Sequence, residues 1–153
     1  MGLLKDAPQE RFDRLRYLEI KHGRVCMLAF TGYIVTAAGI RLPGYLSFSA
    51  DLKFADMPCG LAAFPAMPGA GIIQLVAFIL LLEMSMRDAT GDSEFIGDYR
   101  NGYIDFGWDK YNDATKLKKR TIELNQGRAA MMGITGLVTH EMMGNLDAII
   151  PGQ

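Results

Sequence analysis

The residues EIKHGRVCMLAFTG at positions 19–32 recur as ELNQGRAAMMGITG at positions 123–136. The two segments align without a gap, and the Glu, Gly, Arg, Met, Thr and last Gly coincide. Each segment leads into an uncharged run, so the repeat predicts two equivalent helices that are related by a two-fold axis. We expect the polar residues of the repeat to carry the chemistry of the chain.

The shared Glu and Arg residues predict two ion pairs between the helices. Within each copy the two residues are five positions apart, about 140° around a helix, so they do not face each other on their own helix. Across a two-fold axis Glu19 can meet Arg128, and Glu123 can meet Arg24. An unpaired charge near the middle of a bilayer costs roughly 2.5–3.5 kcal/mol, and reciprocal pairing offsets much of that cost. The alternative is that these are ordinary surface charges at a membrane edge.

A side chain with a free lone pair follows each Glu by three positions, His22 in the first copy and Gln126 in the second. At this spacing the two side chains lie on nearly the same face of the helix. Carboxylate, imidazole and amide oxygen can each donate a lone pair. Mg²⁺ prefers hard ligands and gives up water reluctantly. The pattern therefore favours axial ligands for magnesium that is already held in a macrocycle.

Di-iron carboxylate bundles also use a Glu-x-x-His motif, which makes a metalloenzyme the alternative from a different class. Such a site needs two Glu-x-x-His motifs and two further Glu residues on facing helices. Here the second copy has Glu-x-x-Gln, and the middle helix contains only Glu83. The arginines of the repeat would also repel metal cations. The sequence therefore disfavours a di-iron helical membrane enzyme.

Proline and glycine residues divide the chain into three predicted helices. The first covers about residues 8–40, and the second begins after residue 68 and ends near residues 87–91. The third covers about residues 112–144 and starts with an Asn-Asp N-cap. The residues between the second and third helices, 92–111, are predicted to form a long loop. The length of 153 residues predicts a single domain, residues 1–153.

Only the middle helix has the composition of a conventional membrane span. Residues 61–82 include no charged residue, which meets the requirement of roughly 20 apolar residues. The uncharged runs of the first and third helices cover only residues 25–40 and 129–139, and hydropathy alone would place both in a buried core. The predicted ion pairs would allow these two helices to span in spite of their short uncharged runs.

The distribution of basic residues supports three spans. If all three helices cross, one side of the membrane has twelve Lys and Arg residues near its boundary, and the other side has two, Arg41 and Lys53. This bias is typical of membrane proteins, whose cytoplasmic segments are rich in Lys and Arg. The N-terminus is therefore predicted on the side equivalent to the cytoplasm and the C-terminus on the opposite side.

Composition and charge narrow the function classes. A net charge of −1 provides no basic surface, so a nucleic acid is not an expected partner. The 10 Met and 17 Gly residues suit close helix contacts and an adaptable apolar surface for a ligand. Cys26 and Cys59 have no metal-ligand spacing, and the cysteine in the apolar helical run, Cys26, is expected to be a buried, inert thiol. No targeting peptide is recognisable, so an imported protein would be in its processed form.

The Glu-x-x-His-Gly-Arg and Glu-x-x-Gln-Gly-Arg motifs resemble the paired motifs of the chlorophyll-binding light-harvesting superfamily. Three longer stretches resemble its fucoxanthin chlorophyll a/c-binding branch, which is found in diatoms and related algae. They are FDRLRYLEIKHGR at 12–24, YRNGYIDFGWD at 99–109 and KLKKRTIELNQGR at 116–128. The resemblance extends over essentially the whole chain. It implies an all-α membrane protein with three transmembrane helices, of which the first and third are long, tilted and related by a pseudo-two-fold axis.

The resemblance also implies roles for individual residues. Arg24 and Arg128 would lock the two long helices together. Small residues would let these helices cross and leave grooves for carotenoids: Ala29, Gly32, Gly133 and Gly136. In the middle helix Gln74 and Glu83 would be pigment ligands. Axial ligands of chlorophyll magnesium would be Glu19, His22, Glu123, Gln126 and His140.

Two of these residues have alternative interpretations. His140 would instead be an interfacial histidine bonded to water. Glu83 would instead pair with Arg87 four residues later. The green-plant relatives place their Gln and Glu eight residues apart, whereas Gln74 and Glu83 are nine apart.

By the same resemblance the chain is not an enzyme but an antenna in the thylakoid membrane of a plastid, with a stromal N-terminus and a lumenal C-terminus. Its cofactors would be chlorophyll a, chlorophyll c and fucoxanthin, with diadinoxanthin as a further carotenoid. Its partners would be other antenna subunits, a photosystem core and thylakoid lipids. A photoprotective member that quenches excitation is the alternative within the family, and a membrane scaffold without pigment is the alternative outside it.

Overall fold

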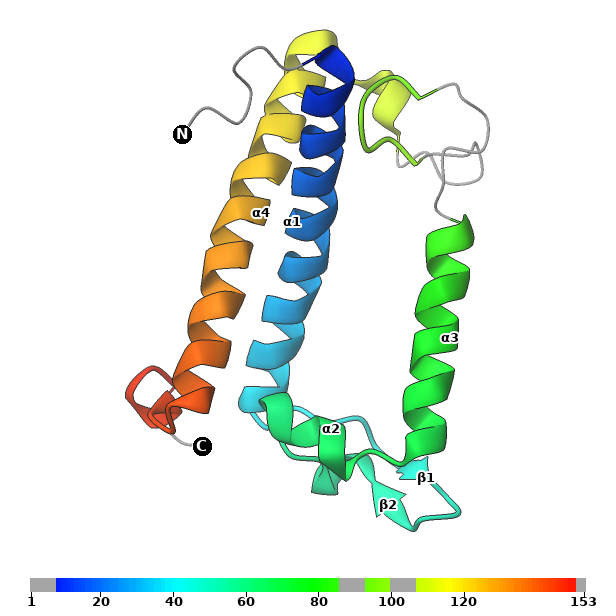
Figure 1. Ribbon diagram of the computed structural model, residues 1–153, viewed down its shortest axis with the longest axis vertical. Coiled ribbons are helices and arrows are strands. Elements are labelled where there is room, and N and C mark those ends of the chain that lie inside the picture. The colour runs from blue at the N-terminus through cyan, green and yellow to red at the C-terminus, as the bar shows by residue number, and fades with distance from the viewer. Residues whose placement is uncertain (1–7, 86–92, 100–106, 151–153) are drawn as a thin grey trace. The chain divides into compact units, whose positions relative to one another are not determined.

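The computed structural model describes residues 8–85, 93–99 and 107–150, and its architecture is predominantly helical (Figure 1). The two segments of the repeat lie on two long helices, α1 (Gln9–Ala37) and α4 (Asp113–Met142). The middle helix is α3 (Gly69–Ser85), which contains Gln74 and Glu83. The prediction of a helical protein with long first and third helices is therefore confirmed.

Helix α4 begins at a side-chain cap, and both long helices are followed by a glycine cap. The Oδ1 atom of Asn112 accepts a hydrogen bond from the Thr115 backbone N–H at 2.9 Å, which caps α4 as predicted. Gly39 and Gly144 follow the last residues of α1 and α4, and their φ angles of 74° and 68° lie in the left-handed region that glycine adopts without strain. At both ends the amides of the glycine and of the next residue bond back to carbonyls of the last turn, which is the Schellman pattern.

The uncharged run at residues 61–82 is not one continuous helix, which corrects the prediction of a conventional span there. A 3₁₀ turn, η2 (Gly60–Ala62), and the short helix α2 (Ala63–Ala66) precede α3. Proline disfavours a helical conformation for the residue before it. Met67, which precedes Pro68, is accordingly extended, with φ −79° and ψ 134°. The chain bends by 116° at this break.

Apolar side chains are largely exposed in this structure. Only Tyr33 and Leu137 are buried apolar residues in the described part of the chain, and they are equivalent positions of the repeat. No residue of α3 is buried, and Ile73 and Leu81 are 71% and 65% exposed. An exposed apolar surface of this extent is typical of sites that contact a membrane, a ligand or another protein. The helices are therefore suited to packing against lipid or ligand rather than forming a closed protein core.

Short elements fill the segments for which the sequence predicted no regular structure. An antiparallel hairpin of β1 (Tyr45–Ser47) and β2 (Leu52–Lys53) follows α1, and it leads into the 3₁₀ turn η1 (Phe54–Asp56). The described part of the predicted 92–111 loop contains the 3₁₀ turn η3 (Trp108–Lys110). The last such turn is η4 (Leu146–Ala148), after α4.

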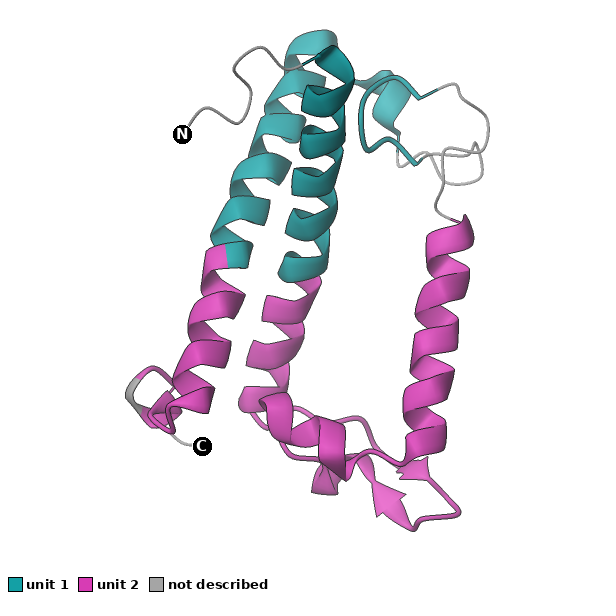
Figure 2. Ribbon diagram, viewed as in Figure 1, with its two compact units in different colours: residues 1–27, 86–131 teal, residues 28–85, 132–153 magenta. Residues whose placement is uncertain are grey.

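The chain divides into two compact units, each with part of α1 and part of α4 (Figure 2). Unit 1 is formed by residues 1–27 and 86–131, and unit 2 by residues 28–85 and 132–153. In unit 1 the two helices touch at Gly23 and Gly127, which are both buried. A Cβ on Gly127 would lie 2.9 Å from Gly23 Cα, and a Cβ on Gly23 would lie 3.0 Å from Gly127 Cα. Glycine is therefore required for this close approach.

Unit 2 is held by different contacts between the same helices. Gly133 packs against the Phe30 ring, where an added Cβ would lie 2.9 Å from a ring carbon. The predicted crossing contacts at Gly32 and Gly136 are wrong, because a Cβ on either glycine meets no atom within 4 Å. The closest backbone approach of the two helices lies nine residues earlier in each copy of the repeat, at Gly23 and Gly127.

Glu141 joins three elements of unit 2. Its Oε2 atom accepts a hydrogen bond from the Tyr33 hydroxyl at 2.9 Å, and its Oε1 atom accepts one from the Leu61 backbone N–H at 2.6 Å. The carboxylate thereby ties the last turn of α4 to α1 and to η2. Gly60 provides the room, because a Cβ there would overlap the carboxylate.

Candidate functional site

Both ion pairs of the repeat are present in unit 1, with matching geometry. Arg24 Nε donates to Glu123 Oε1 at 2.6 Å, and Arg128 Nε donates to Glu19 Oε1 at 2.6 Å. Each glutamate uses its Oε1 atom for the arginine. Among the contacts of the described residues, the Oε2 atom of each carboxylate is left with lone pairs for a further ligand.

The two pairs differ in how firmly their arginines are held. Arg24 also donates from Nη1 to the Gly97 carbonyl oxygen at 2.7 Å, and its guanidinium lies 5.4 Å from the centre of the Tyr99 ring. Its side chain is 34% exposed, whereas that of Arg128 is 56% exposed. Arg24 therefore connects both helices to the loop at residues 93–99, whereas the contact that Arg128 makes among the described residues joins the two helices to each other.

The hydrogen bonds of the two histidines select the tautomer that can bind a metal. His22 Nδ1 lies 2.7 Å from the Leu18 carbonyl oxygen, and His140 Nδ1 lies 2.9 Å from the Asn145 amide oxygen. Both oxygens only accept hydrogen bonds, so Nδ1 is the donor in each ring. In the neutral imidazole the lone pair then lies on Nε2. This is the arrangement in which a second hydrogen bond orients a metal-ligating histidine.

The remaining candidates lie on the same helices at exposed positions. Gln126 is exposed one turn after Glu123 on α4, and Gln74 and Glu83 are exposed on α3. Glu19, His22, Glu123 and Gln126 belong to unit 1, and Gln74, Glu83 and His140 belong to unit 2. The alternative partner of Glu83, Arg87, lies outside the described residues.

Each candidate would act as a single ligand. Within residues 8–85, 93–99 and 107–150, no three His, Cys, Asp or Glu side chains are placed to hold one metal ion together. A metal bound by one protein atom must obtain its other ligands elsewhere. A macrocycle that already supplies four nitrogen ligands meets that requirement, and Mg²⁺ accepts a neutral nitrogen or a carboxylate or amide oxygen as its axial ligand. The donor set therefore fits magnesium tetrapyrroles.

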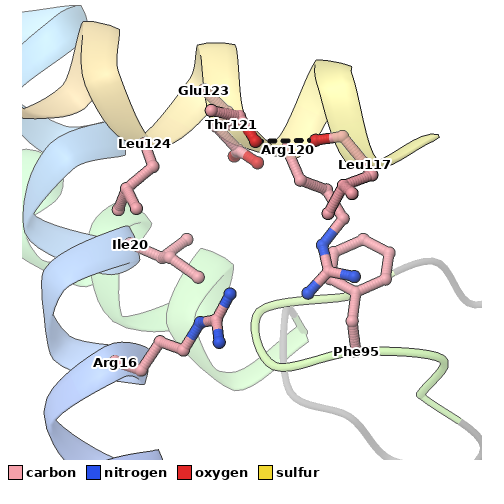
Figure 3. A pocket seen from close by; sticks show the side chains of 8 residues that line it. All are labelled: Arg16, Ile20, Phe95, Leu117, Arg120, Thr121, Glu123 and Leu124. Atoms are coloured by element: carbon pink, nitrogen blue, oxygen red, sulfur yellow. Dashed lines mark hydrogen bonds between the residues drawn. The ribbon is translucent and has the colours of Figure 1, made fainter. Parts of the chain in front are cut away.

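A small cavity adjoins Glu123 in unit 1 (Figure 3). Arg16 and Arg120, which are equivalent in the repeat, line it together with Phe95, and the Arg120 guanidinium lies 4.3 Å from the centre of the Phe95 ring. Its volume is about 80 Å³. Sites for small organic ligands enclose roughly 300–1,000 Å³, so this cavity is too small to enclose a macrocycle.

A larger cavity lies in unit 2 beside Gln74. Its volume is about 560 Å³, which falls within the usual range for organic ligands. The hairpin and the first half of α3 form its walls, and no charged residue is among them. The lining residues are Leu46, Ser47, Ser49, Met67, Pro68, Ala70, Gly71, Gln74, Leu75 and Phe78.

Comparison with known proteins confirms the resemblance seen in the sequence. Residues 1–142 match the family described as chlorophyll A-B binding protein. The chloroplastic fucoxanthin-chlorophyll a-c binding protein D of Phaeodactylum tricornutum is 58% identical over 145 residues, covering 94% of this chain and 73% of its own length. The corresponding protein of Trieres chinensis is 53% identical, covering 98% and 75%. Protein B of Macrocystis pyrifera is 51% identical, covering 98% and 69%.

Proposed function

Because the chain belongs to the chlorophyll A-B binding protein family, we propose that it is a light-harvesting antenna that binds chlorophyll a, chlorophyll c and fucoxanthin. The names of its relatives in three algae support these pigments. The protein is not an enzyme. In such an antenna the pigments absorb light and pass excitation to a photosystem, whereas the protein fixes their spacing and orientation.

The observation that carries this proposal is the pair of reciprocal Arg–Glu contacts at 2.6 Å. Each arginine neutralises a glutamate of the other helix and uses only Oε1, which leaves Oε2 to bind magnesium. The site then has a neutral ion pair and a satisfied ligand in apolar surroundings, where lone charges are costly. His22 and His140 would supply Nε2, and Gln74 and Gln126 would supply an amide oxygen. Glu83 on α3 would be a further magnesium ligand, through its carboxylate.

We place the protein across the thylakoid membrane of a plastid. Among the described residues, no single helix is both long and apolar enough to qualify as a span, and only the bent pair Gly60–Ala66 and Gly69–Ser85 qualifies jointly. At 1.5 Å per residue, α1 and α4 are about 43 and 45 Å long. This length exceeds a hydrocarbon core of roughly 30 Å even for tilted helices. The excess of basic residues would place the N-terminus in the stroma and the C-terminus in the lumen.

The exposed apolar faces of the helices suit a multi-subunit antenna. We propose that they pack against other antenna subunits, thylakoid lipids and pigments, with excitation passing on to a photosystem core. Diadinoxanthin is proposed as a second carotenoid beside fucoxanthin. The net charge of −1 provides no field for nucleic acid.

Solvent extraction of the purified native complex, followed by chromatography, is expected to yield chlorophyll a, chlorophyll c and fucoxanthin. Fucoxanthin has a conjugated carbonyl, so its absorption in the complex should also differ from its absorption in organic solvent. Chlorophyll b and lutein in place of chlorophyll c and fucoxanthin would contradict the proposed branch. A complex without any chlorophyll would contradict the antenna function itself.

Replacing His22 or His140 with phenylalanine is expected to remove one chlorophyll each and to leave the fold intact, because neither histidine carries a charge that locks the helices. The chlorophyll-to-protein ratio of the reconstituted variants checks this expectation. His22→Gln is the matched control, because glutamine occupies the equivalent position 126; it should keep the full ratio. An unchanged ratio in both phenylalanine variants would rule out the two histidines as ligands.

A further inference from the structure

We propose that the Ser47–Ser49 pair of the β1–β2 hairpin donates a hydrogen bond to the ring keto group of the chlorophyll for which Gln74 is the proposed magnesium ligand. This proposal rests on the antenna function and adds to it the residues that recognise one pigment. The two elements belong to the same compact unit (Figures 1 and 2).

One face of α3 provides the first wall of the cavity. Ala70, Gln74 and Phe78 follow one another at intervals of four residues, and Gly71 and Leu75 lie beside them at the same interval. Residues four apart in a helix lie on one face. The small side chains at positions 70 and 71 leave room next to Gln74 for a flat ring to approach the helix, and Phe78 offers an aromatic surface for it to lie against.

The hairpin provides the opposite wall and its hydroxyl groups. The Oγ atoms of Ser47 and Ser49 are 3.1 Å apart, and Ser47 Oγ accepts a hydrogen bond from the Ala50 backbone N–H at 3.3 Å. Two hydroxyl groups have two hydrogens, and their mutual bond uses one of them. When Ser47 donates to Ser49, the hydrogen of Ser49 is available for an acceptor in the cavity.

The chemistry of these walls selects the occupant. Ten residues line a cavity of about 560 Å³, and none of them is charged. A free cation or anion is therefore a poor match, because none of the lining residues offers it a counter-charge. The walls suit a large apolar molecule with a cation that is already neutralised and with a carbonyl oxygen at its edge. A magnesium chlorin has both features.

Resonance Raman spectroscopy of the full-length chain reconstituted with chlorophyll a, chlorophyll c and fucoxanthin tests the proposal, because it reports the keto carbonyl stretch of bound chlorophyll. Ser49→Ala keeps the Ser47–Ala50 turn contact, and Ser47→Ala/Ser49→Ala removes both donors. In the double variant one hydrogen-bonded keto band is expected to move to higher frequency, while the number of chlorophylls per protein stays unchanged. Ser85→Ala is the matched control, because its hydroxyl bonds to the Leu82 carbonyl oxygen on the same helix, away from the cavity; its spectrum should equal that of the unmodified protein.

Gln74→Leu is expected to remove one chlorophyll per protein and, with it, the hydrogen-bonded keto band. Adding the two serine substitutions to Gln74→Leu should then leave the keto spectrum unchanged. The proposal is overturned if the double serine variant has an unchanged keto spectrum, or if the serine-sensitive band persists after Gln74→Leu. It is also overturned if Gln74→Leu keeps every chlorophyll and loses a bound lipid instead. All three results leave chlorophyll binding by the unmodified protein in place, whereas failure of the antenna function would abolish that binding.

Discussion

Replacing Arg24 with leucine is expected to destabilise the protein and to remove the chlorophyll at Glu123, on the other long helix. The substitution leaves the Glu123 carboxylate without its partner at 2.6 Å and breaks the bond to the Gly97 carbonyl oxygen. Breaking one side of a buried ion pair costs about 3–5 kcal/mol. Because the Arg24 side chain is 34% exposed, we expect a value near the lower end of that range.

Loss of the pigment follows from the same unpaired charge. Without Arg24, nothing holds the Glu123 side chain in place, and a carboxylate that can turn towards water is a poorer magnesium ligand. The measurement is thermal loss of chlorophyll circular dichroism, together with the absorption difference from the unmodified protein. That difference should match the one for Glu123→Leu. If it matched Glu19→Leu instead, the reciprocal pairing would be wrong.

Two further variants separate charge from ligation. Arg24→Leu/Glu123→Gln has no unpaired carboxylate but keeps an amide oxygen, as Gln126 offers naturally, so it should recover the chlorophyll and the part of the stability that does not depend on the bond to Gly97. Arg128→Leu removes the equivalent arginine of the repeat. It should cost less than Arg24→Leu, because Arg128 is more exposed and does not contact the loop at residues 93–99.

The features that the sequence predicted well are those specified by local chemistry or by the repeat. Asn112 caps α4 because its side chain competes for the first free amides of a helix. The ion pairs Arg24–Glu123 and Arg128–Glu19 could be predicted because the gapless repeat implies a two-fold relation, and equivalent charges across a two-fold axis meet in reciprocal pairs. Neither prediction required knowledge of distant contacts.

The features that were missed depend on backbone geometry or on contacts between distant segments. The start of the second helix after residue 68 was predicted from Pro68, but hydropathy counted residues 61–82 as one span, and the angle of 116° at the break could not be read from composition. Glycine content alone does not show where the two helices touch. The predicted contact was at Gly32 and Gly136, whereas the helix backbones meet at Gly23 and Gly127. Glu141 has no counterpart in the repeat, so its bonds to Tyr33 and Leu61 had no sequence signal.

The same distinction between local chemistry and contacts of distant segments applies to the candidate site. Every proposed ligand is a prediction from its residue type and spacing or from the family resemblance, because axial ligation needs only one side chain per pigment. The hairpin that faces Gln74 was not anticipated, since residues 45–53 contain neither a repeat nor a ligand motif. Hydrogen-bond donors around a pigment come from whichever segment folds over it. They are therefore visible only in the structure.

The largest expected effect on the helix contact itself comes from Gly127→Ala. The added methyl group would lie 2.9 Å from Gly23 Cα and 3.5 Å from Gly23 C, and both are backbone atoms that cannot rotate away. The helices must separate, at a cost of about 1–3 kcal/mol for overpacking. Both ion pairs lie within one turn of this contact, so separation stretches two bonds of 2.6 Å together. We therefore expect loss of the chlorophylls at both Glu19 and Glu123.

Gly136→Ala is the matched control. It makes the same substitution nine residues later on the same helix, where a methyl group meets no atom within 4 Å. Alanine favours a helix over glycine by about 1 kcal/mol, so this variant should be at least as stable as the unmodified protein and keep all its chlorophylls. Thermal melting of the reconstituted complexes and their chlorophyll-to-protein ratios make the comparison. Equal stability and pigment content in the two variants would show that the Gly23–Gly127 contact does not hold the ion pairs in register, because the sole physical difference between the substitutions is the backbone that the methyl group meets.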